Sequence, residues 1–121
     1  MATVRYLVAD VDASIAFYLK LGFELANRMG PPFAIMRLGD LNLWLSGPAS
    51  SAARALPNGS RPVPGGWNRL VIEVADIHVT VNDVKVQGGS FRSEPMEGPG
   101  GWQAVCDDPS GNPIELFQPR G

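Results

Sequence analysis

The chain repeats its own pattern, and this repeat limits its fold more than any other feature. The tripeptide Val-Ala-Asp at residues 8–10 recurs 66 residues later, at 74–76, each time after a stretch of alternating apolar residues. The ends of the two halves also match, because "LGDLNLWLSGP" (38–48) parallels "SGNPIELFQP" (110–119). Self-similarity at a fixed spacing is typical of a duplicated supersecondary unit. We therefore expect two modules of one architecture.

Each half has the pattern of one strand, one helix and three further strands. Alternation places residues 4, 6 and 8 on one face of the first strand and 3, 5 and 7 on the other, and it separates 70, 72 and 74 from 69, 71 and 73 in the second half. Short segments bounded by turn residues predict the remaining strands at 23–28, 32–38, 41–46, 90–94, 102–107 and 112–118. The predicted fold class is α+β, with two tandem β-α-β-β-β modules.

The two predicted helices begin after acidic residues. Asp10 or Asp12 in the first half, and Asp76 in the second, are placed to cap free backbone N–H groups. The first helix is expected to end at Gly22 and to carry an apolar stripe of Ile15, Phe17, Tyr18, Leu19 and Leu21. Residues 77, 79 and 81 alternate as in a strand, but residues 77, 81 and 84 fit a helical face before Gly88. The repeat favours the helix.

A segment rich in Pro, Gly, Ser and Ala separates the halves, from residue 47 to residue 66. We expect a single domain over 1–121, with module 1 at 1–46, a linker at 47–66 and module 2 at 67–121. Loops of this length are usually functional or mobile. The linker is interpreted either as a tether between the modules or as an arm that packs on a partner subunit or covers a site.

Charge and composition exclude several classes of partner. The formal net charge is -2 and no run of Lys or Arg follows a phosphate backbone, so no nucleic-acid partner is expected. No run of 18 apolar residues and no signal-peptide core is present, so we expect no membrane partner and a cytoplasmic location. Cys106 is the only cysteine, which excludes an intrachain disulfide and favours a buried, inert thiol over a nucleophile.

Two segments carry a resemblance to a known family. The stretch "VADVDASIAFYLKLGF" opens the first module and "DPSGNPIELFQP" closes the second. With the doubled β-α-β-β-β unit, they resemble the glyoxalase/bleomycin resistance/dioxygenase superfamily, also called vicinal oxygen chelate proteins, over residues 4–119. The resemblance implies that each module curls its strands into a half-barrel and that paired modules enclose a cleft. It implies a fold rather than one activity, because this fold serves isomerases, lyases, dioxygenases, thiol transferases and metal-free antibiotic-binding proteins.

The resemblance also implies where a metal would lie. Enzymes of the family hold a divalent ion with His or Gln from the first strand and Glu or His from the last strand of each module. Carried over to this chain, those positions are Thr3, Trp44, Arg69 and Glu115. A gapless alignment would give Leu43 in place of Trp44, but it would turn an apolar residue toward the cleft. Only Glu115 of the four is a usual ligand, and an arginine offers donors only.

No metal and no cofactor are therefore predicted. The single histidine, His78, follows Asp76 in the first turn of the second helix, where we expect it to lie away from the cleft.

The alternation of side chains along each strand also predicts which residues line the cleft. The candidate ligand-binding residues are Thr3, Arg5, Trp44, Arg69, Glu73, Glu115 and Phe117. Arg69 is expected to meet Glu115 in a two-pronged contact, which is interpreted either as a structural pair in place of the metal or as part of a ligand site. In the second interpretation Arg69 binds a ligand oxygen, while Glu115 or Glu73 accepts a proton or meets a cation. Asn42 shares this phase, and Trp44, Phe117, Met36 and Trp102 are candidates for stacking on a flat ligand.

Three functions remain open from the sequence. The first is a metal-free binder of a small, aromatic organic molecule, working as a homodimer whose cleft is built from both chains. The second is a lyase, isomerase or dioxygenase of the same superfamily that uses Glu115 as general base or metal ligand. The third is a protein without a ligand that holds a partner through the linker and the sheet edges.

Overall fold

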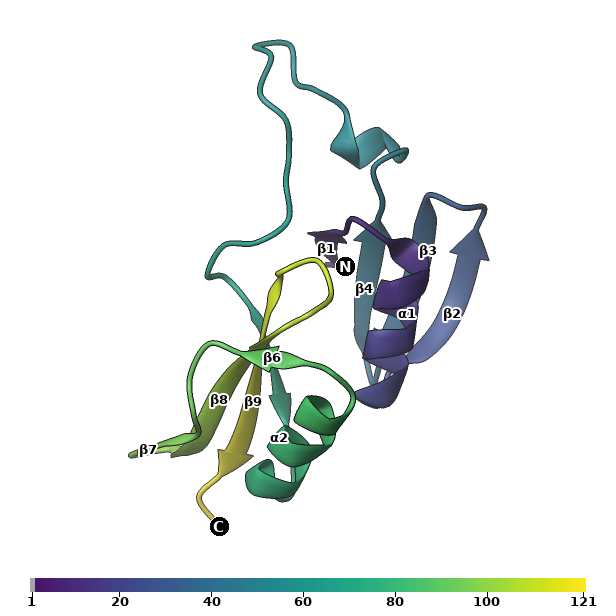
Figure 1. The fold of residues 1–121 in the computed structure, drawn as a ribbon. Helices are drawn as coiled ribbons and strands as arrows, with labels where there is room; N and C mark the ends of the chain where they lie inside the picture. Colours follow the sequence, from purple (N-terminus) through teal and green to yellow (C-terminus); the bar gives the residue numbers. More distant parts are fainter. Residues whose placement is uncertain (1) are drawn as a thin grey trace. The chain divides into compact units, whose positions relative to one another are not determined.

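The chain divides into two compact units, 1–65 (unit 1) and 66–121 (unit 2). The computed structural model describes residues 2–121. Each unit contains one sheet and one α-helix in the order expected from the repeat (Figure 1). The predicted α+β class with two β-α-β-β-β modules is confirmed, with one strand of the second module divided in two.

Unit 1 is a four-stranded sheet with one helix on one face. Its elements are β1 (Val4–Leu7), α1 (Val11–Lys20), β2 (Glu24–Met29), β3 (Phe33–Leu38) and β4 (Leu41–Ser46), followed by a short 3₁₀ turn, η1 (Ser51–Ala53). The strand order is β1-β4-β3-β2. The first strand is parallel to the last, and the other neighbours are antiparallel. The crossover through α1 makes this parallel pairing possible.

Unit 2 repeats this topology. Its elements are β5 (Leu70–Glu73), α2 (Ile77–Val86), β6 (Ser90–Phe91), β7 (Met96–Gly98), β8 (Gly101–Asp107) and β9 (Pro113–Pro119). The order is β5-β9-β8-β6, with β7 also paired to β8 and β5 parallel to β9. The single strand predicted at 90–94 is therefore wrong. The chain leaves the ladder before Pro95, which has no N–H to donate, and returns to it as β7.

Each sheet has one face against its helix and one face that the helix leaves uncovered, which we call the open face. The helix-facing side chains of unit 1 include Ala34, Met36, Leu43 and Leu45, each with 0% exposure. Met36 is thus a core residue, and its predicted role in stacking on a ligand is wrong. The choice of Trp44 over Leu43 for the open face agrees with the register, since Trp44 pairs with Arg5 and Leu43 with Val4.

The helices begin at the predicted caps. The carboxylate of Asp10 accepts a hydrogen bond from Ala13 N at 3.0 Å, and that of Asp76 accepts from His78 N and Val79 N at 3.1 and 3.2 Å. In α2 the buried residues are the predicted ones, Ile77, Val81 and Val84.

The predicted stripe of α1 is partly wrong. The buried residues of this helix are Val11, Ser14, Ile15 and Tyr18, whereas Leu19 is 47% exposed. The spacing of 3, 4 and 7 residues centres the buried stripe on residues 11–18, so Leu19 falls at its edge. Neither helix of the described chain has the length and hydrophobicity needed to cross a bilayer.

Removing the Asp76 cap should destabilise unit 2 by about 1 kcal/mol, because two backbone N–H groups lose their acceptor. We expect Asp76→Ala to lower the midpoint of urea unfolding, followed by circular dichroism. Asp83→Ala removes the same charge from an exposed position of the same helix and is the matched control. Equal effects of the two substitutions would contradict a capping role.

Candidate functional site

The open face of unit 2 holds an ion pair at the position that the sequence predicted. Arg69 lies two residues before Val71, which is the register partner of Glu115, so both side chains share this face. Arg69 Nε donates to Glu115 Oε1 at 3.0 Å, and Arg69 Nη2 lies 2.8 Å from the same oxygen. The side chains are 27% and 11% exposed. The pair is predicted correctly in its partners, although both contacts go to one carboxylate oxygen.

The second oxygen of Glu115 is left available. Within residues 2–121, the only fully buried side-chain N or O atom without a hydrogen-bond partner is Ser46 Oγ. Glu115 Oε2 accepts no hydrogen bond from any described group, and it is not among the fully buried atoms without a partner. A carboxylate oxygen in this state is an acceptor for a ligand hydroxyl or amine.

A second arginine orders the start of unit 2. Arg92 Nε donates to Asp107 Oδ1 at 2.8 Å, and Nη1 and Nη2 donate to Gly66 O at 2.7 Å and Gly111 O at 3.1 Å. Its Cζ lies 4.5 Å from the ring centroid of Trp67. The sequence analysis missed both residues. Trp67 lies two residues before Arg69, so the alternation of side chains along a strand could have pointed to it. Residue 67 lies outside β5, however, and alternation applies only within a strand.

The open face of unit 1 carries an arginine over an aromatic ring. Arg5 Cζ lies 5.0 Å from the centroid of its register partner Trp44, and Trp44 meets Phe33 edge to face at 5.5 Å. Arg5 is exposed, and its guanidinium has no hydrogen-bond or ion-pair partner among residues 2–121. Arg37 Nε donates to Asn42 Oδ1 at 3.1 Å on the same face. This surface therefore presents two aromatic rings in edge-to-face contact, with a cation over the ring of Trp44.

The structure brings the predicted residues together within each unit. Arg5 contacts Trp44, Arg69 contacts Glu115, and Glu73 is the register partner of Phe117. Thr3 precedes β1 and is exposed. The ligand-binding role of these seven residues stays a prediction.

Trp102 does not belong to the open face. It pairs with Gln118, whose side chain accepts from Ile77 N of α2 at 2.8 Å, so this row of the sheet faces the helix. The rings of Trp102 and His78 meet at 5.1 Å. The predicted stacking of Trp102 on a ligand of the open face is wrong, whereas the position of His78 in the first turn of the helix is as expected.

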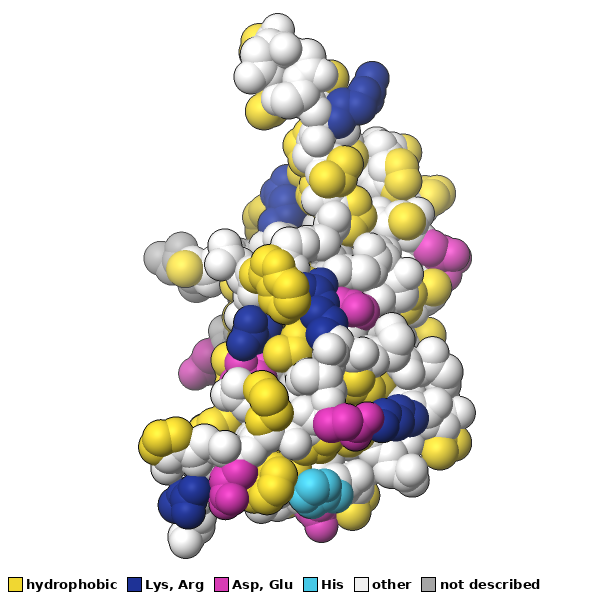
Figure 2. Space-filling view, turned by 60° about the vertical axis from the view of Figure 1, so that its left-hand side comes forward, with side chains coloured by type: hydrophobic (Ala, Val, Ile, Leu, Met, Phe, Trp, Pro, Cys, Tyr) yellow, Lys and Arg dark blue, Asp and Glu magenta, His cyan; other side chains and the backbone are white. Residues whose placement is uncertain are grey.

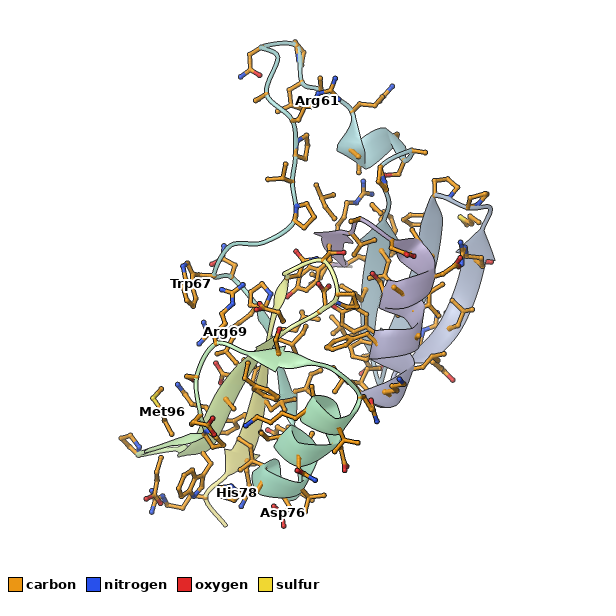
Figure 3. The ribbon with its side chains drawn as sticks, in the orientation of Figure 1. Arg61, Trp67, Arg69, Asp76, His78 and Met96 are labelled. Atoms are coloured by element: carbon orange, nitrogen blue, oxygen red, sulfur yellow. The ribbon has the colours of Figure 1, made fainter. Side chains whose placement is uncertain are left out.

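The segment between the two sheets forms a pocket on unit 1. This pocket of about 270 Å³ lies between the ends of β1 and β4 and the returning chain, and its lining includes Leu7, Ser46, Ala53, Arg61 and Val63. Residues 61–64 of the segment 47–65 thus line the pocket with the ends of β1 and β4, while Figure 3 shows the segment as a long loop that extends outward. Its role as tether or as arm stays a prediction.

Basic, acidic and hydrophobic side chains lie next to one another on the side of the molecule that Figure 2 presents. A sequence profile of the Glyoxalase/Bleomycin resistance protein/Dioxygenase superfamily matches residues 1–116. The chain belongs to this superfamily.

Related proteins agree with this assignment. An uncharacterized protein from Mycolicibacterium smegmatis is 30% identical over 112 residues, which cover 91% of this chain and 85% of that protein. The fold is similar to a lactoylglutathione lyase from Agrobacterium tumefaciens, with a TM-score of 0.72, 20% identity and coverage of 98% and 92% of the two chains. A glyoxalase family protein from Bacillus cereus gives a TM-score of 0.76 at 21% identity, with coverage of 100% and 94%. These structural likenesses show the fold.

The residues at the superfamily's metal positions do not fit a divalent ion. Carried over from the resemblance, the four positions fall on Thr3, Trp44, Arg69 and Glu115. Arg69 brings a permanent cation, and it contacts Oε1 of Glu115, the one residue of the four that commonly binds metals. The one histidine contacts Trp102 on the helix side, and residues 2–121 contain no group of three His, Cys, Asp or Glu that fits a metal. The donor chemistry needed for such an ion is missing from this set.

Breaking the Arg69–Glu115 pair should cost stability because Glu115 would remain as a poorly solvated, unpaired charge. We expect Arg69→Met to lower the free energy of unfolding by about 1–3 kcal/mol in urea titrations at neutral pH. The double variant Arg69→Met/Glu115→Met should recover part of this loss. Lys85→Met removes a cation from a more exposed pair, with side chains 44% and 82% exposed, and should cost less than about 1 kcal/mol. Equal losses in the two single variants would contradict the pair's buried character.

The thiol of Cys106 should be unreactive in the folded protein. Burial, with a smaller contribution from the negative charge of Asp107, raises the pKa of this thiol from 9.0 to about 12. The thiolate is the reactive form, so iodoacetamide should label the native protein very slowly at pH 8–9 and the urea-unfolded protein rapidly. Because the unfolded chain ionises first, this group's contribution to stability is complete below pH 9 and is lost as the pH rises toward 12. Rapid labelling of the native protein, read by mass spectrometry, would disprove a buried thiol.

Proposed function

We propose that this superfamily member binds a small, aromatic organic molecule without the usual divalent metal. The observation that carries this proposal is the contact of Arg69 with Glu115 Oε1, since a cation stands where the superfamily's enzymes place a metal ligand. A guanidinium cannot donate an electron pair to a metal, and its charge repels one. The site is thus better suited to hydrogen bonds and ring contacts than to metal chemistry.

The polar groups without hydrogen-bond or ion-pair partners indicate the kind of molecule that would bind. In unit 1, Arg5 offers hydrogen-bond donors above the ring of Trp44. In unit 2, Glu115 Oε2 and the exposed carboxylate of Glu73 offer acceptors beside the half-buried ring of Phe117. Pockets for small organic molecules combine apolar walls with a few such polar groups. A flat ring bearing an acceptor suits the face of unit 1, and a flat ring bearing a hydroxyl or amine donor suits the face of unit 2.

The two modules are proposed to act as one domain over 1–121, and the protein to act as a homodimer whose cleft draws on both chains. The doubled topology supports this, because each unit leaves one sheet face uncovered by its own helix. Val71 is 55% exposed on such a face, and Met96, the partner of Gln103, is 52% exposed. Both side chains belong to the face that α2 leaves uncovered, where a ligand or a partner could bury them.

A second candidate function is an enzyme of the same superfamily, a lyase, isomerase or dioxygenase that uses Glu115 as general base. The free Oε2 atom is the observation that favours it, because a base needs an oxygen that the substrate can reach. Turnover of a substrate that depends on Glu115 would select this candidate over simple binding.

Thermal unfolding in the presence of a library of aromatic compounds tests the binding function. A true ligand at ten times its Kd should raise the Tm by about 5 °C, since binding only to the folded state adds about 1.4 kcal/mol. For each hit, Trp44→Leu and Glu115→Gln should weaken binding. Lys85→Gln, which changes a charge on α2, should leave binding unchanged.

Elemental analysis of protein purified without chelator tests the metal-free part of the proposal. We expect well under one metal ion per chain and no rise in Tm when Mn²⁺, Ni²⁺ or Zn²⁺ is added. One transition metal per chain, lost in Glu115→Gln, would overturn the proposal in favour of a metalloenzyme.

A further inference from the structure

Trp67 is a large apolar side chain left in an unusual position. It is 69% exposed, although it lies only two residues before Arg69 of the unit 2 site (Figure 3). Moving an indole out of water lowers the free energy, so the exposure of this tryptophan is worth explaining. Single exposed apolar residues are common, but this one is held in place by contacts on both its ring and its backbone.

The ring of Trp67 is fixed from one side. The Arg92 guanidinium lies 4.5 Å from the ring centroid, and its three nitrogens are bound to Asp107, Gly66 O and Gly111 O. The side chain of Arg92 is 19% exposed, so it is a firm support rather than a mobile surface cation. A cation over one face of an indole stabilises the ring by attraction to its π-electrons. Because Trp67 is 69% exposed, much of its side chain remains open to solvent.

The backbone of Trp67 is tied to the ion pair. Arg69 Nη1 donates to Trp67 O at 3.3 Å while Arg69 Nε donates to Glu115 Oε1. One guanidinium therefore links the backbone of Trp67 to the carboxylate of Glu115. Trp67 and Glu115 thus belong to one hydrogen-bonded group centred on Arg69.

We propose that Trp67, positioned by Arg92, is the residue of unit 2 that selects an aromatic ring over a saturated one. This proposal rests on the proposed function and names a contact for its ligand. A flat aromatic ring stacks on the side of the indole that Arg92 does not cover, while the polar group of the ligand meets Glu115. Aromatic contacts beyond simple burial give about a two- to tenfold preference. Arg92 is a positioning residue, because it touches Trp67 and not the ligand.

Two neutral alcohols of similar shape test the selection. The probes are 2-naphthol and decahydro-2-naphthol, which carry the same hydroxyl on a flat and on a saturated ring system, and their Kd values are measured by titration calorimetry. We expect the protein to prefer 2-naphthol and Trp67→Leu to lose about two- to tenfold of that preference. Trp67→Phe should restore most of it, because the ring returns. Arg92→Lys should weaken the preference less than Trp67→Leu does.

Matched variants separate the outcomes. Val86→Leu changes an exposed apolar residue of α2, 77% exposed and outside the site, and should leave the preference unchanged. If 2-naphthol binds and depends on Glu115→Gln, but Trp67→Leu leaves the preference intact, the inference about Trp67 fails while the proposed function stands. If neither alcohol binds the unaltered protein, the proposed function fails for this ligand class, and the inference falls with it. A change from dimer to monomer in Trp67→Leu, seen by sedimentation, would assign the ring to a subunit interface and overturn the inference.

Discussion

The parallel pairing of the first strand with the last strand in each unit is the constraint on which the candidate site depends. In unit 1 it aligns Arg5 with Trp44, and in unit 2 it aligns Val71 with Glu115 and so brings Arg69 to that carboxylate. These partners are 39 and 46 residues apart in the chain. A parallel pair needs a crossover, and α1 or α2 with the strands that follow provides it. The helix then covers one face, so the other face is left for chemistry.

The open faces differ between the units in the charge that they leave available. Residues 1–65 contain six Lys or Arg and four Asp or Glu, whereas residues 66–121 contain four and eight. In unit 2 both arginines near the site are already engaged by carboxylates, Arg69 by Glu115 and Arg92 by Asp107. What remains there is an acceptor. In unit 1 what remains is Arg5, a donor. The duplicated scaffold has therefore produced two surfaces with opposite hydrogen-bonding character.

Much of this arrangement follows from the period of a strand. Side chains alternate between faces, so fixing Glu115 on one face also fixed Phe117 and excluded Leu116, and the same reasoning chose Trp44 over Leu43. The caps at Asp10 and Asp76 followed from local chemistry in the same way. These inferences needed only neighbours along the chain and the repeat that relates the halves.

The features that sequence reasoning missed depend on side chains that reach across strands. Arg92 lies just beyond the two-residue strand β6, yet it donates to carbonyl oxygens of residues 66 and 111, which no periodic pattern relates to it. Its contact with Trp67 needs the chain before β5 to turn onto the sheet, where alternation gives no guidance. The division of the strand predicted at 90–94 occurs at this arginine. The hydrogen bond from Arg92 N to Val105 O is the last one before the chain leaves the ladder. An arginine at such a break is free of the regular sheet and long enough to tie three loops together, which is why the most specific element of the site is also the least predictable one.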